Sequence, residues 1–291
     1  MIKVKLSYYP GCGLSGSSKE LDISVKAISG PLGIDIVEVP DWNCCGGTSA
    51  HSTGHFLSFA LPARNVVKAE KTGCDEFTAP CPACYVRHFL AQKQLNEDAK
   101  MKRHLENALG QNFEQSDIKI KNLIEVYIDR FSSSNVTKPL KGLKVVNYYG
   151  CALVKPPKTF NFFDDPENPK SLEKIMDTCG AESIEWPYKT ECCGASLCFT
   201  NQDVVWKNGR DILQVAKDSG AQAIVVACTM CQMNLDMRQA QINKKYKTNF
   251  NIPVMYFTQL MGLAMGIPAD RLGFDKLYVD AKPLLHSLKL L

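Results

Sequence analysis

The sequence has no hydrophobic run long enough to cross a membrane. Its most apolar stretch, residues 253–267, is only 15 residues long and is interrupted by Gln259 and Gly262. A membrane-spanning helix needs about 20 apolar residues. The opening residues, which include Lys3 and Lys5, also lack an apolar signal stretch. These absences favour a cytoplasmic protein that is not itself inserted in a membrane.

Runs of lysine or arginine are absent as well. The net charge of +4 over 291 residues is too small to predict a nucleic-acid surface, so we expect no nucleic-acid partner. Hydrophobic residues make up 45% and charged residues 22%, which is an ordinary globular composition. Isolated basic residues near the motifs below, Arg87, Lys155 and Lys189, are candidates for contacting a small anion.

Cysteine, in contrast, is abundant, with 13 residues. Ten of them form two copies of one pattern: a single cysteine, then Cys-Cys-Gly, then Cys-x-x-Cys. The first copy is Cys12, Cys44-Cys45-Gly46 and Cys81-Pro82-Ala83-Cys84, and the second is Cys151, Cys192-Cys193-Gly194 and Cys228-Thr229-Met230-Cys231. The gaps are 31 and 35 residues in the first copy and 40 and 34 in the second. Repetition in the same order predicts a duplicated metal-cluster module.

The spacing of these cysteines argues against a disulfide framework. Vicinal and Cys-x-x-Cys pairs are metal or redox spacings, and a chain of this length can bury a full core without disulfides. Five cysteines per copy is one more than a tetrahedral zinc site or a cubane cluster uses, so one is either spare or bridges two metals. Cys74, Cys179 and Cys198 lie outside the pattern, and we expect packed thiols there, with a redox role for Cys198 as a minor alternative.

Strand and helix patterns alternate along both copies. Residues 4–9, 34–39 and 223–227 read as strands, and the last is an apolar run that leads into Cys228. Helical patterns are predicted between them, including one long helix over 85–109. Residues 118–131 could form a strand or another helix, and their helical spacing favours the helix. We therefore predict an α/β fold of two pseudo-symmetric halves, 1–135 and 140–291, each a small, mostly parallel sheet with covering helices.

Local geometry follows from the residues around the cysteines. Adjacent strand residues point to opposite faces, so Cys44 and Cys45 can share a cluster only from a turn, which Gly46 allows; Gly194 does the same in the second copy. Both Cys-x-x-Cys pairs stand where a helix is predicted to begin. The positive end of the helix dipole lowers the pKa of a thiol placed there.

Aromatic and imidazole side chains near the motifs have simpler expected roles. Trp42, Trp186 and the Tyr8-Tyr9 and Tyr148-Tyr149 pairs are expected to pack around the sites and exclude water. His51, His55 and His88 are expected to be surface or core residues, with proton donation to a product thiolate as the weaker alternative.

The doubled pattern resembles the cysteine-rich CCG-domain family, and within it the B subunits of methanogenic heterodisulfide reductases. The resemblance spans essentially the whole chain and is carried by both cysteine sets and by further stretches: Cys81-Pro82-Ala83-Cys84-Tyr85, Glu191-Cys192-Cys193-Gly194-Ala195-Ser196-Leu197, Asp164-Asp165-Pro166-Glu167-Asn168-Pro169 and Thr258-Gln259-Leu260-Met261-Gly262-Leu263-Ala264. It implies that each set of five cysteines ligates a non-cubane 4Fe-4S cluster, with one cysteine bridging.

The resemblance also implies an activity. The family's enzymes reduce CoM-S-S-CoB, the mixed disulfide of coenzyme M and coenzyme B, to the two thiols in methanogenesis, with the substrate held between the clusters. Electrons would come from a C subunit with cubane clusters, fed by a flavin-bifurcating A subunit and, further upstream, a hydrogenase or formate dehydrogenase. Disulfide cleavage takes two electrons, which two one-electron clusters can supply.

Three alternatives remain open at this point. The chain could be an electron-transfer subunit of a lactate, glycolate, thiol:fumarate or succinate oxidoreductase from the same domain family. Such relatives often carry ferredoxin-like Cys-x-x-Cys-x-x-Cys runs, which this sequence lacks. It could also be a non-catalytic anchoring subunit, which predicts no activity with any disulfide. Finally, one half could hold a structural zinc ion.

Overall fold

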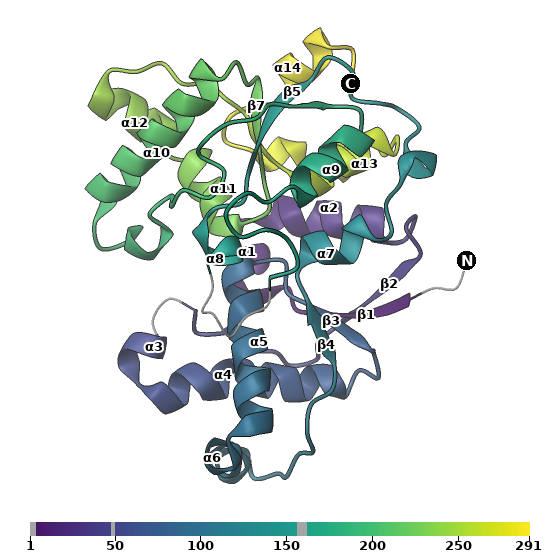
Figure 1. The fold of residues 1–291 in the computed structure, drawn as a ribbon, viewed down its shortest axis with the longest axis vertical. Helices are drawn as coiled ribbons and strands as arrows, with labels where there is room; N and C mark the ends of the chain where they lie inside the picture. The colour runs from purple at the N-terminus through teal and green to yellow at the C-terminus, as the bar shows by residue number, and fades with distance from the viewer. Residues whose placement is uncertain (1–3, 48–49, 156–161) are drawn as a thin grey trace. The chain divides into compact units, whose positions relative to one another are not determined.

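A computed structural model describes residues 4–47, 50–155 and 162–291 (Figure 1). The chain forms two compact units. Unit 1 comprises Met1–Cys12 and Gly33–Val126, and unit 2 comprises Gly13–Leu32 and Tyr127–Leu291. The first five-cysteine set therefore belongs to unit 1 and the second to unit 2. The cluster-binding halves 1–135 and 140–291 are defined by the sequence repeat and stay a prediction.

Unit 1 is built on a parallel sheet with strand order β2-β1-β3-β4. Its strands are β1 (Val4–Tyr8), β2 (Ile34–Glu38), β3 (Glu76–Thr78) and β4 (Lys119–Lys121). Leu6 pairs with Ile36 on one side of β1 and with Glu76 on the other. The central strand β1 thus runs between two parallel neighbours, and its carboxyl end lies beside those of β2 and β3.

Helices connect the strands of unit 1. They are α1 (Gly11–Ser15), whose last residues pass into unit 2, α3 (Ala50–Thr53), α4 (His55–Glu70), α5 (Pro82–Glu97), α6 (Ala99–Leu109) and α7 (Leu123–Ile128), which also runs across the unit boundary. Helices α4 and α5 pack against each other and cross in Figure 1. Phe59, Val67 and Leu95 belong to the apolar cluster that these helices bury with α6. This packing fixes the helix that follows Cys81.

Unit 2 repeats the parallel sheet with strand order β6-β5-β7-β8. Its strands are β5 (Lys144–Tyr148), β6 (Glu182–Ser183), β7 (Ala223–Val226) and β8 (Val254–Tyr256). Every residue of β7 is buried, as expected for a parallel strand that is covered on both faces. The predicted α/β fold, with two similar halves that each hold a parallel sheet and covering helices, is confirmed.

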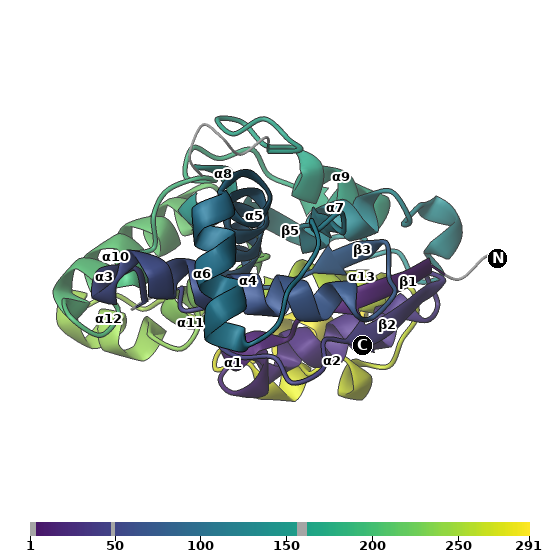
Figure 2. The same cartoon turned by 90° about the horizontal axis from the view of Figure 1, so that it is seen from below.

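The helices of unit 2 include one from early in the chain. They are α2 (Lys19–Ser29), α8 (Cys151–Val154), α9 (Ser171–Thr178), α10 (Gln202–Asp218), α11 (Thr229–Leu235), α12 (Gln239–Tyr246), α13 (Phe257–Ala264) and α14 (Lys282–Ser287). Short 3-10 turns occupy Ser133–Asn135, Ala195–Leu197, Ala269–Arg271 and Phe274–Lys276. Helices α10 and α12 contact each other and lie side by side in Figures 1 and 2.

Helix α2 joins β1 to β2 in sequence, yet it packs on α13 of unit 2. The hydroxyl groups of Ser24 and Thr258 are hydrogen-bonded at 2.7 Å. Gly262 allows the close approach, because a Cβ there would lie 3.2 Å from Ile28 and only 2.3 Å from the Leu272 side chain. The compact units are therefore not continuous in sequence.

Two helix predictions were wrong in detail. The single helix expected over 85–109 is two helices, α5 and α6, because Asp98 leaves the helical conformation and its carboxylate accepts from the backbone N–H groups of Lys100 and Met101. The helix expected over 118–131 is the short strand β4 followed by α7. Within the described residues, no helix is both long and apolar enough to span a bilayer.

Candidate metal-cluster sites

The cysteines gather at the carboxyl ends of adjacent parallel strands. In unit 1, Cys12 follows β1 and Cys81 follows β3, its neighbour in the sheet. In unit 2, Cys151 follows β5 and Cys228 follows β7. The Cys-Cys-Gly segments come after β2 and β6, on the other side of the central strand. Loops at this edge are where open α/β sheets place their sites.

In unit 1 the five predicted cysteines form two neighbouring groups, and contacts between sulfur atoms hold each group together. The sulfur atoms of Cys45 and Cys84 are 3.2 Å apart. Cys12 is hydrogen-bonded to Cys44, and Cys81 to Cys84. The single cysteine thus contacts the first cysteine of Cys-Cys-Gly. The second cysteine of Cys-Cys-Gly contacts the second cysteine of Cys-x-x-Cys.

Unit 2 shows the same pairing. The sulfur atoms of Cys151 and Cys192 are 3.5 Å apart, and those of Cys193 and Cys231 are 3.7 Å apart. Cys228 is hydrogen-bonded to Cys231. None of the 13 cysteines, all of which lie in the described part of the chain, forms a disulfide, so no disulfide competes with either set.

The glycine of each Cys-Cys-Gly turns the chain so that its N–H faces a sulfur atom. Gly46 has a φ of +71° and donates to the Cys44 sulfur at 3.4 Å; Gly194 has a φ of +78° and donates to the Cys192 sulfur at 3.3 Å. Positive φ is the left-handed region that glycine adopts without a steric penalty. This explains how two adjacent cysteines serve one site.

Both Cys-x-x-Cys pairs stand at helix starts, as predicted. Cys81 is the N-cap of α5, with Pro82 in the first helical position, and Cys228 is the N-cap of α11. Unpaired backbone N–H groups at a helix start favour a thiolate. In both units the second cysteines of Cys-Cys-Gly and Cys-x-x-Cys are buried, whereas Cys12, Cys44 and Cys192 are exposed. Each set therefore has an inner, buried part and an outer part that solvent reaches.

A tyrosine in each unit holds the Cys-Cys-Gly loop. The hydroxyl of Tyr9 donates to the carbonyl of Asn43 at 2.9 Å, and that of Tyr148 donates to the carbonyl of Glu191 at 2.6 Å. Both acceptors immediately precede the Cys-Cys-Gly, and both tyrosines lie three residues before the single cysteine. For Tyr9 and Tyr148 the prediction that the tyrosines pack around the sites is confirmed, since both are buried and bonded to the loops that carry the cysteines.

Asparagines from the helix after each Cys-Cys-Gly also hold the loop, and sequence reasoning missed them. In unit 1 the carboxamide of Asn65 accepts from the Asn43 N–H at 2.9 Å and donates to its carbonyl at 2.8 Å. In unit 2 the Asn208 amide donates to the Cys192 carbonyl at 2.9 Å. These residues lie on α4 and α10, and no motif in the sequence marks them.

Asn234 contacts the second set directly. Its side-chain amide is 3.5 Å from the Cys193 sulfur and 3.2 Å from the Cys193 carbonyl oxygen. Its position three residues after Cys231 on α11, one helical turn from a ligand candidate, is the signal that sequence reasoning overlooked. The corresponding residue in unit 1, three after Cys84, is Arg87.

Contacts within each set shift thiol pKa values in the same direction in both units. The contact with Cys84 lowers the pKa of Cys45, and the contact with Cys231 lowers that of Cys193 to about 7. The partners Cys84 and Cys231 have raised pKa values because they keep the shared proton. The charge of Arg87 and the amide of Asn234 also lower the pKa of Cys45 and Cys193 respectively.

The pKa of the single cysteine in each set is raised. Burial of the thiol and the nearby Cys44 raise the pKa of Cys12 to about 11, and burial and Cys192 raise that of Cys151 to about 12. A bound cation would reverse these shifts, because it stabilises a coordinated thiolate.

The described residues settle some of the secondary predictions. Lys189 is not free to bind an anion: its ammonium pairs with Glu173 at 2.7 Å and with Glu185 at 3.0 Å, and its side chain is 5% exposed. His88 is a core residue whose burial lowers its pKa to about 3, and its Nε2 lies 3.2 Å from the Asn65 amide. The side chain of His51 lies outside the described residues.

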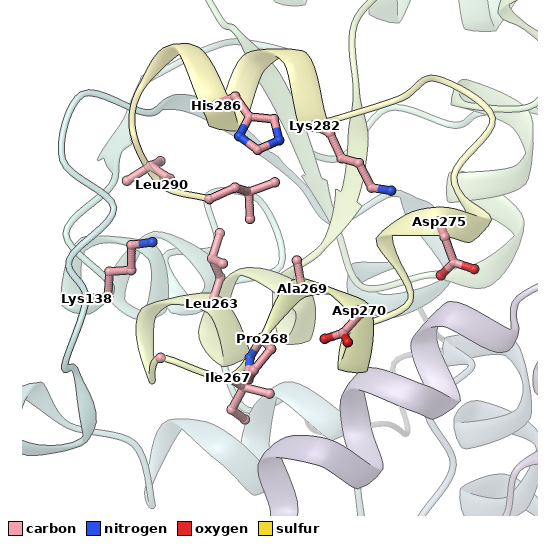
Figure 3. Close-up of a pocket in the computed structure, with 12 residues that line it drawn as sticks. Lys138, Leu263, Ile267, Pro268, Ala269, Asp270, Asp275, Lys282, His286 and Leu290 are labelled. Atoms are coloured by element: carbon pink, nitrogen blue, oxygen red, sulfur yellow. The ribbon is translucent and has the colours of Figure 1, made fainter.

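The cysteines outside the pattern are packed thiols, as predicted. Cys74, Cys179 and Cys198 are 7%, 0% and 1% exposed. A cavity of about 690 Å³ in unit 2 is also separate from the cysteines: none of the described residues that line it is a cysteine. Figure 3 shows Lys282 and His286 of α14 on one side of it and Ala269 and Asp270 on the other.

The donor set fits an iron–sulfur cluster in each unit. Five thiols converge in each, thiolates are the ligands that such clusters use, and a helix N-terminus supports the charge. In residues 4–47, 50–155 and 162–291, no three His, Cys, Asp or Glu side chains are arranged as ligands of a single metal ion. The thiols instead contact one another, as described above.

Curated relatives match nearly the full chain. The 8-methylmenaquinol:fumarate reductase membrane anchor subunit of Wolinella succinogenes is 32% identical over 96% of this chain and 99% of its own length. The B subunit of the ferredoxin:CoB-CoM heterodisulfide reductase of Methanosarcina mazei is 30% identical over 94% of this chain and 93% of its own length.

A solved structure supports the fold. A hypothetical protein from Helicobacter pylori superposes with a TM-score of 0.78 over 95% of this chain at 15% identity, and the chain spans about half (52%) of that protein. A model of the Cysteine-rich domain, CCG, matches residues 6–87 and 145–236, which hold both five-cysteine sets. The chain therefore belongs to the cysteine-rich CCG-domain family.

Proposed function

We propose that each five-cysteine set holds a non-cubane 4Fe-4S cluster and that the chain is the subunit of an oxidoreductase complex that reduces a small-molecule disulfide. The substrate we propose is the CoM-S-S-CoB heterodisulfide, on the strength of the similarity to the B subunit of a heterodisulfide reductase. The observation that carries the proposal is the same contact pattern among five thiols in both units. On this proposal the cluster-binding halves are 1–135 and 140–291.

The overall reaction balances with two one-electron centres. One disulfide, two electrons and two protons give two thiols, so the S–S bond breaks and each sulfur gains one electron and one proton. A bound iron–sulfur cluster supplies one electron at a time and an iron that can accept a sulfur ligand. Two such sets in one chain match the electron count.

This chain's own residues provide access and orientation. The exposed Cys12 and Cys44 in unit 1, and Cys192 in unit 2, leave one side of each set open to a substrate sulfur. The buried Cys45, Cys84 and their counterparts keep the other side away from water. Tyr9 and Tyr148 fix the loop between these two sides through hydrogen bonds to its backbone.

A second candidate function is electron transfer without disulfide chemistry. It is favoured by the 32% identity to the membrane anchor subunit of a methylmenaquinol:fumarate reductase. In that role the two sets would relay electrons between a quinol-linked site and a partner that reduces fumarate. Partners analogous to the C and A subunits of heterodisulfide reductase belong to the first candidate. For that candidate we propose the cytoplasm, a reducing compartment in which thiols persist.

Anaerobic metal analysis combined with a disulfide reductase assay separates the candidates. We expect about eight irons per chain, four for each cluster, no zinc, and turnover of CoM-S-S-CoB with a reduced viologen as the electron donor. An electron paramagnetic resonance signal should change when the heterodisulfide is added. Full iron without turnover or a substrate-dependent signal would favour electron transfer, and about four irons with one zinc would contradict two equivalent clusters.

A further inference from the structure

Asn234 is buried at the second cysteine set and points at a sulfur atom. Its residue is 0% exposed, and its amide nitrogen lies 3.5 Å from the Cys193 sulfur, within the range of an N–H···S hydrogen bond. The same nitrogen lies 3.2 Å from the carbonyl oxygen of Cys193. Both acceptors belong to Cys193, so the Asn234 carboxamide is hydrogen-bonded to both the side chain and the backbone of that cysteine.

Arg238 fixes the orientation of this carboxamide. The Nε of Arg238 donates to the Asn234 side-chain oxygen at 3.1 Å. Because an arginine nitrogen can only donate, the oxygen must face Arg238 and the NH₂ group must face Cys193. Arg238 is itself held, since its guanidinium donates to the Cys198 carbonyl at 3.4 Å.

We infer that Asn234 is a positioning residue that raises the reduction potential of the cluster held by the second cysteine set. Donating a hydrogen bond to a ligand sulfur withdraws negative charge from the thiolate, which stabilises the reduced, more negative cluster. Burial strengthens the effect, because the local dielectric constant is low. This inference rests on the proposed function, in that it requires an iron–sulfur cluster on Cys193.

The hydrogen bond from Asn234 to the Cys193 sulfur adds to the hydrogen bonds that both cysteine sets have in common. The Gly46 and Gly194 backbone N–H groups make the same N–H···S contact in both units. At the position that corresponds to Asn234, unit 1 has Arg87, a charged residue that is partly exposed. A neutral, buried amide donor is therefore the contribution of unit 2.

The test is a redox titration followed by electron paramagnetic resonance on the purified, cluster-loaded chain. For Asn234→Leu we expect the ratio of oxidised to reduced cluster to rise about tenfold for one cluster at a given potential. For a one-electron couple this corresponds to a midpoint potential that is about 59 mV lower. The other cluster should keep its midpoint. Asn234→Asp retains a side-chain oxygen for Arg238 but replaces the amide that donates to the Cys193 sulfur. It should therefore also lower the midpoint potential of the same cluster.

Asn208→Leu is the matched control. Asn208 donates its side-chain amide to the Cys192 carbonyl at 2.9 Å and to no sulfur that the structure describes. It therefore tests loss of an asparagine hydrogen bond in the same loop, and both midpoints should stay unchanged.

Each outcome bears on the inference separately from the proposed function. Full iron content with unchanged midpoints in both Asn234 variants overturns the inference and leaves the proposed function standing. The same holds if Asn208→Leu shifts the midpoint equally, or if both Asn234 variants lose the second cluster while Asn208→Leu keeps it, because the role is then structural. A wild-type chain with no second cluster overturns the proposed function and the inference together.

Discussion

The two cysteine sites share the parts that place the sulfur atoms and differ in the polar groups around them. In both, the single cysteine contacts the first cysteine of Cys-Cys-Gly, a glycine N–H faces that sulfur, and a tyrosine hydroxyl holds the preceding carbonyl. Their surroundings diverge. In unit 1, Asn65 is hydrogen-bonded to the loop backbone. In unit 2, Asn208 is hydrogen-bonded to the loop backbone and Asn234 to a sulfur atom.

This comparison distinguishes the residues that set the geometry of the sites from those that set the local electrostatics. Features that recur in both units set where the ligands lie, and a change in them should disturb either site alike. Features found in one unit set the charge distribution around one site, so they can give two chemically similar centres different properties. The following predictions test how far the two sites are alike and how far they are independent.

The largest effect is expected from removing one ligand candidate in one unit. Cys45→Ala and Cys193→Ala should each lose about half of the iron, because each set lies within its own unit. Iron and sulfide analysis of the two variants measures this. The matched controls Cys74→Ala and Cys179→Ala, buried thiols outside the sets in units 1 and 2, should retain all of it. Loss of all iron from either single variant would mean that the sites are not independent.

The next effect concerns the glycines of the Cys-Cys-Gly turns. Alanine at Gly46 or Gly194 must adopt a positive φ, which costs about 1–2 kcal/mol. In Gly46→Ala the new Cβ would also lie 2.5 Å from the Ala50 Cβ, compared with 3.2 Å from the Val205 Cα in Gly194→Ala. Urea unfolding should therefore show a larger loss of stability for Gly46→Ala.

Matched controls isolate the clash from the backbone strain. Gly73 in unit 1 and Gly220 in unit 2 also have positive φ, but a Cβ there would meet no atom within 4 Å. Gly73→Ala and Gly220→Ala should lose only the backbone strain, about 1–2 kcal/mol, with no further loss from a clash. Equal losses for Gly46→Ala and Gly73→Ala would show that the turn in unit 1 relaxes to admit a methyl group.

A smaller effect is expected from the tyrosines. Tyr148→Phe removes the hydroxyl that bonds the Glu191 carbonyl, and should cost about 1–2 kcal/mol of unfolding free energy. Tyr9→Phe should cost less, about 0.5–1 kcal/mol, because the Asn43 carbonyl keeps its bond from Asn65. Urea unfolding measures both, with the exposed Tyr278→Phe as a neutral control. A larger loss in Tyr9→Phe would reverse the proposed order.

The last effect is a pH dependence that comes from two buried carboxyl groups of unit 2. The described carboxyl groups with a raised pKa, Glu20 at about 7 and Asp236 at about 6, both belong to it. Burial is the main cause for each; for Glu20 the nearby Asp236 adds to the shift and Lys276 opposes it. The folded state then holds a proton on Glu20 that the unfolded state loses between pH 4.5 and about 7, so the contribution of Glu20 to stability falls as pH rises through this window.

Glu20→Gln tests this pH dependence. The variant cannot lose a proton at position 20, so its urea midpoint should decline less between about pH 5 and about pH 7.5 than that of the wild type. Lys26→Gln, which removes an exposed charge of α2, is the control and should keep the wild-type slope. Parallel curves for Glu20→Gln and the wild type would exclude Glu20 as the source.

Much of the sites was predictable because the relevant signals are local. The order and spacing of the cysteines identified all ten thiols that come into contact, and Cys-Cys-Gly required a turn because adjacent strand residues diverge. The buried run Ala223–Val226 indicated a parallel strand that leads to Cys228. The helix starts at Cys81 and Cys228 followed from the same patterns.

Other features depended on groups far apart in sequence. Asn65 and Asn43 are 22 residues apart, and no spacing rule pairs them. Asn234 and Cys193 are 41 residues apart, and the one local signal is that Asn234 lies a helical turn after Cys231. Lys189 looked available for an anion until packing brought Glu173 beside it. Helix α2 lies between the strands β1 and β2 in sequence but packs with unit 2, because its apolar face fits α13.

The sequence by itself determined the ligand candidates, their turns and the alternation that builds two parallel sheets, because hydrophobic period, glycine and cysteine spacing act over a few residues. The tertiary structure alone decided which polar group faces which sulfur. That choice depends on how helices such as α4, α10 and α11 pack against the loops, and at equivalent helical positions the two units carry a buried amide, Asn234, and a charged side chain, Arg87.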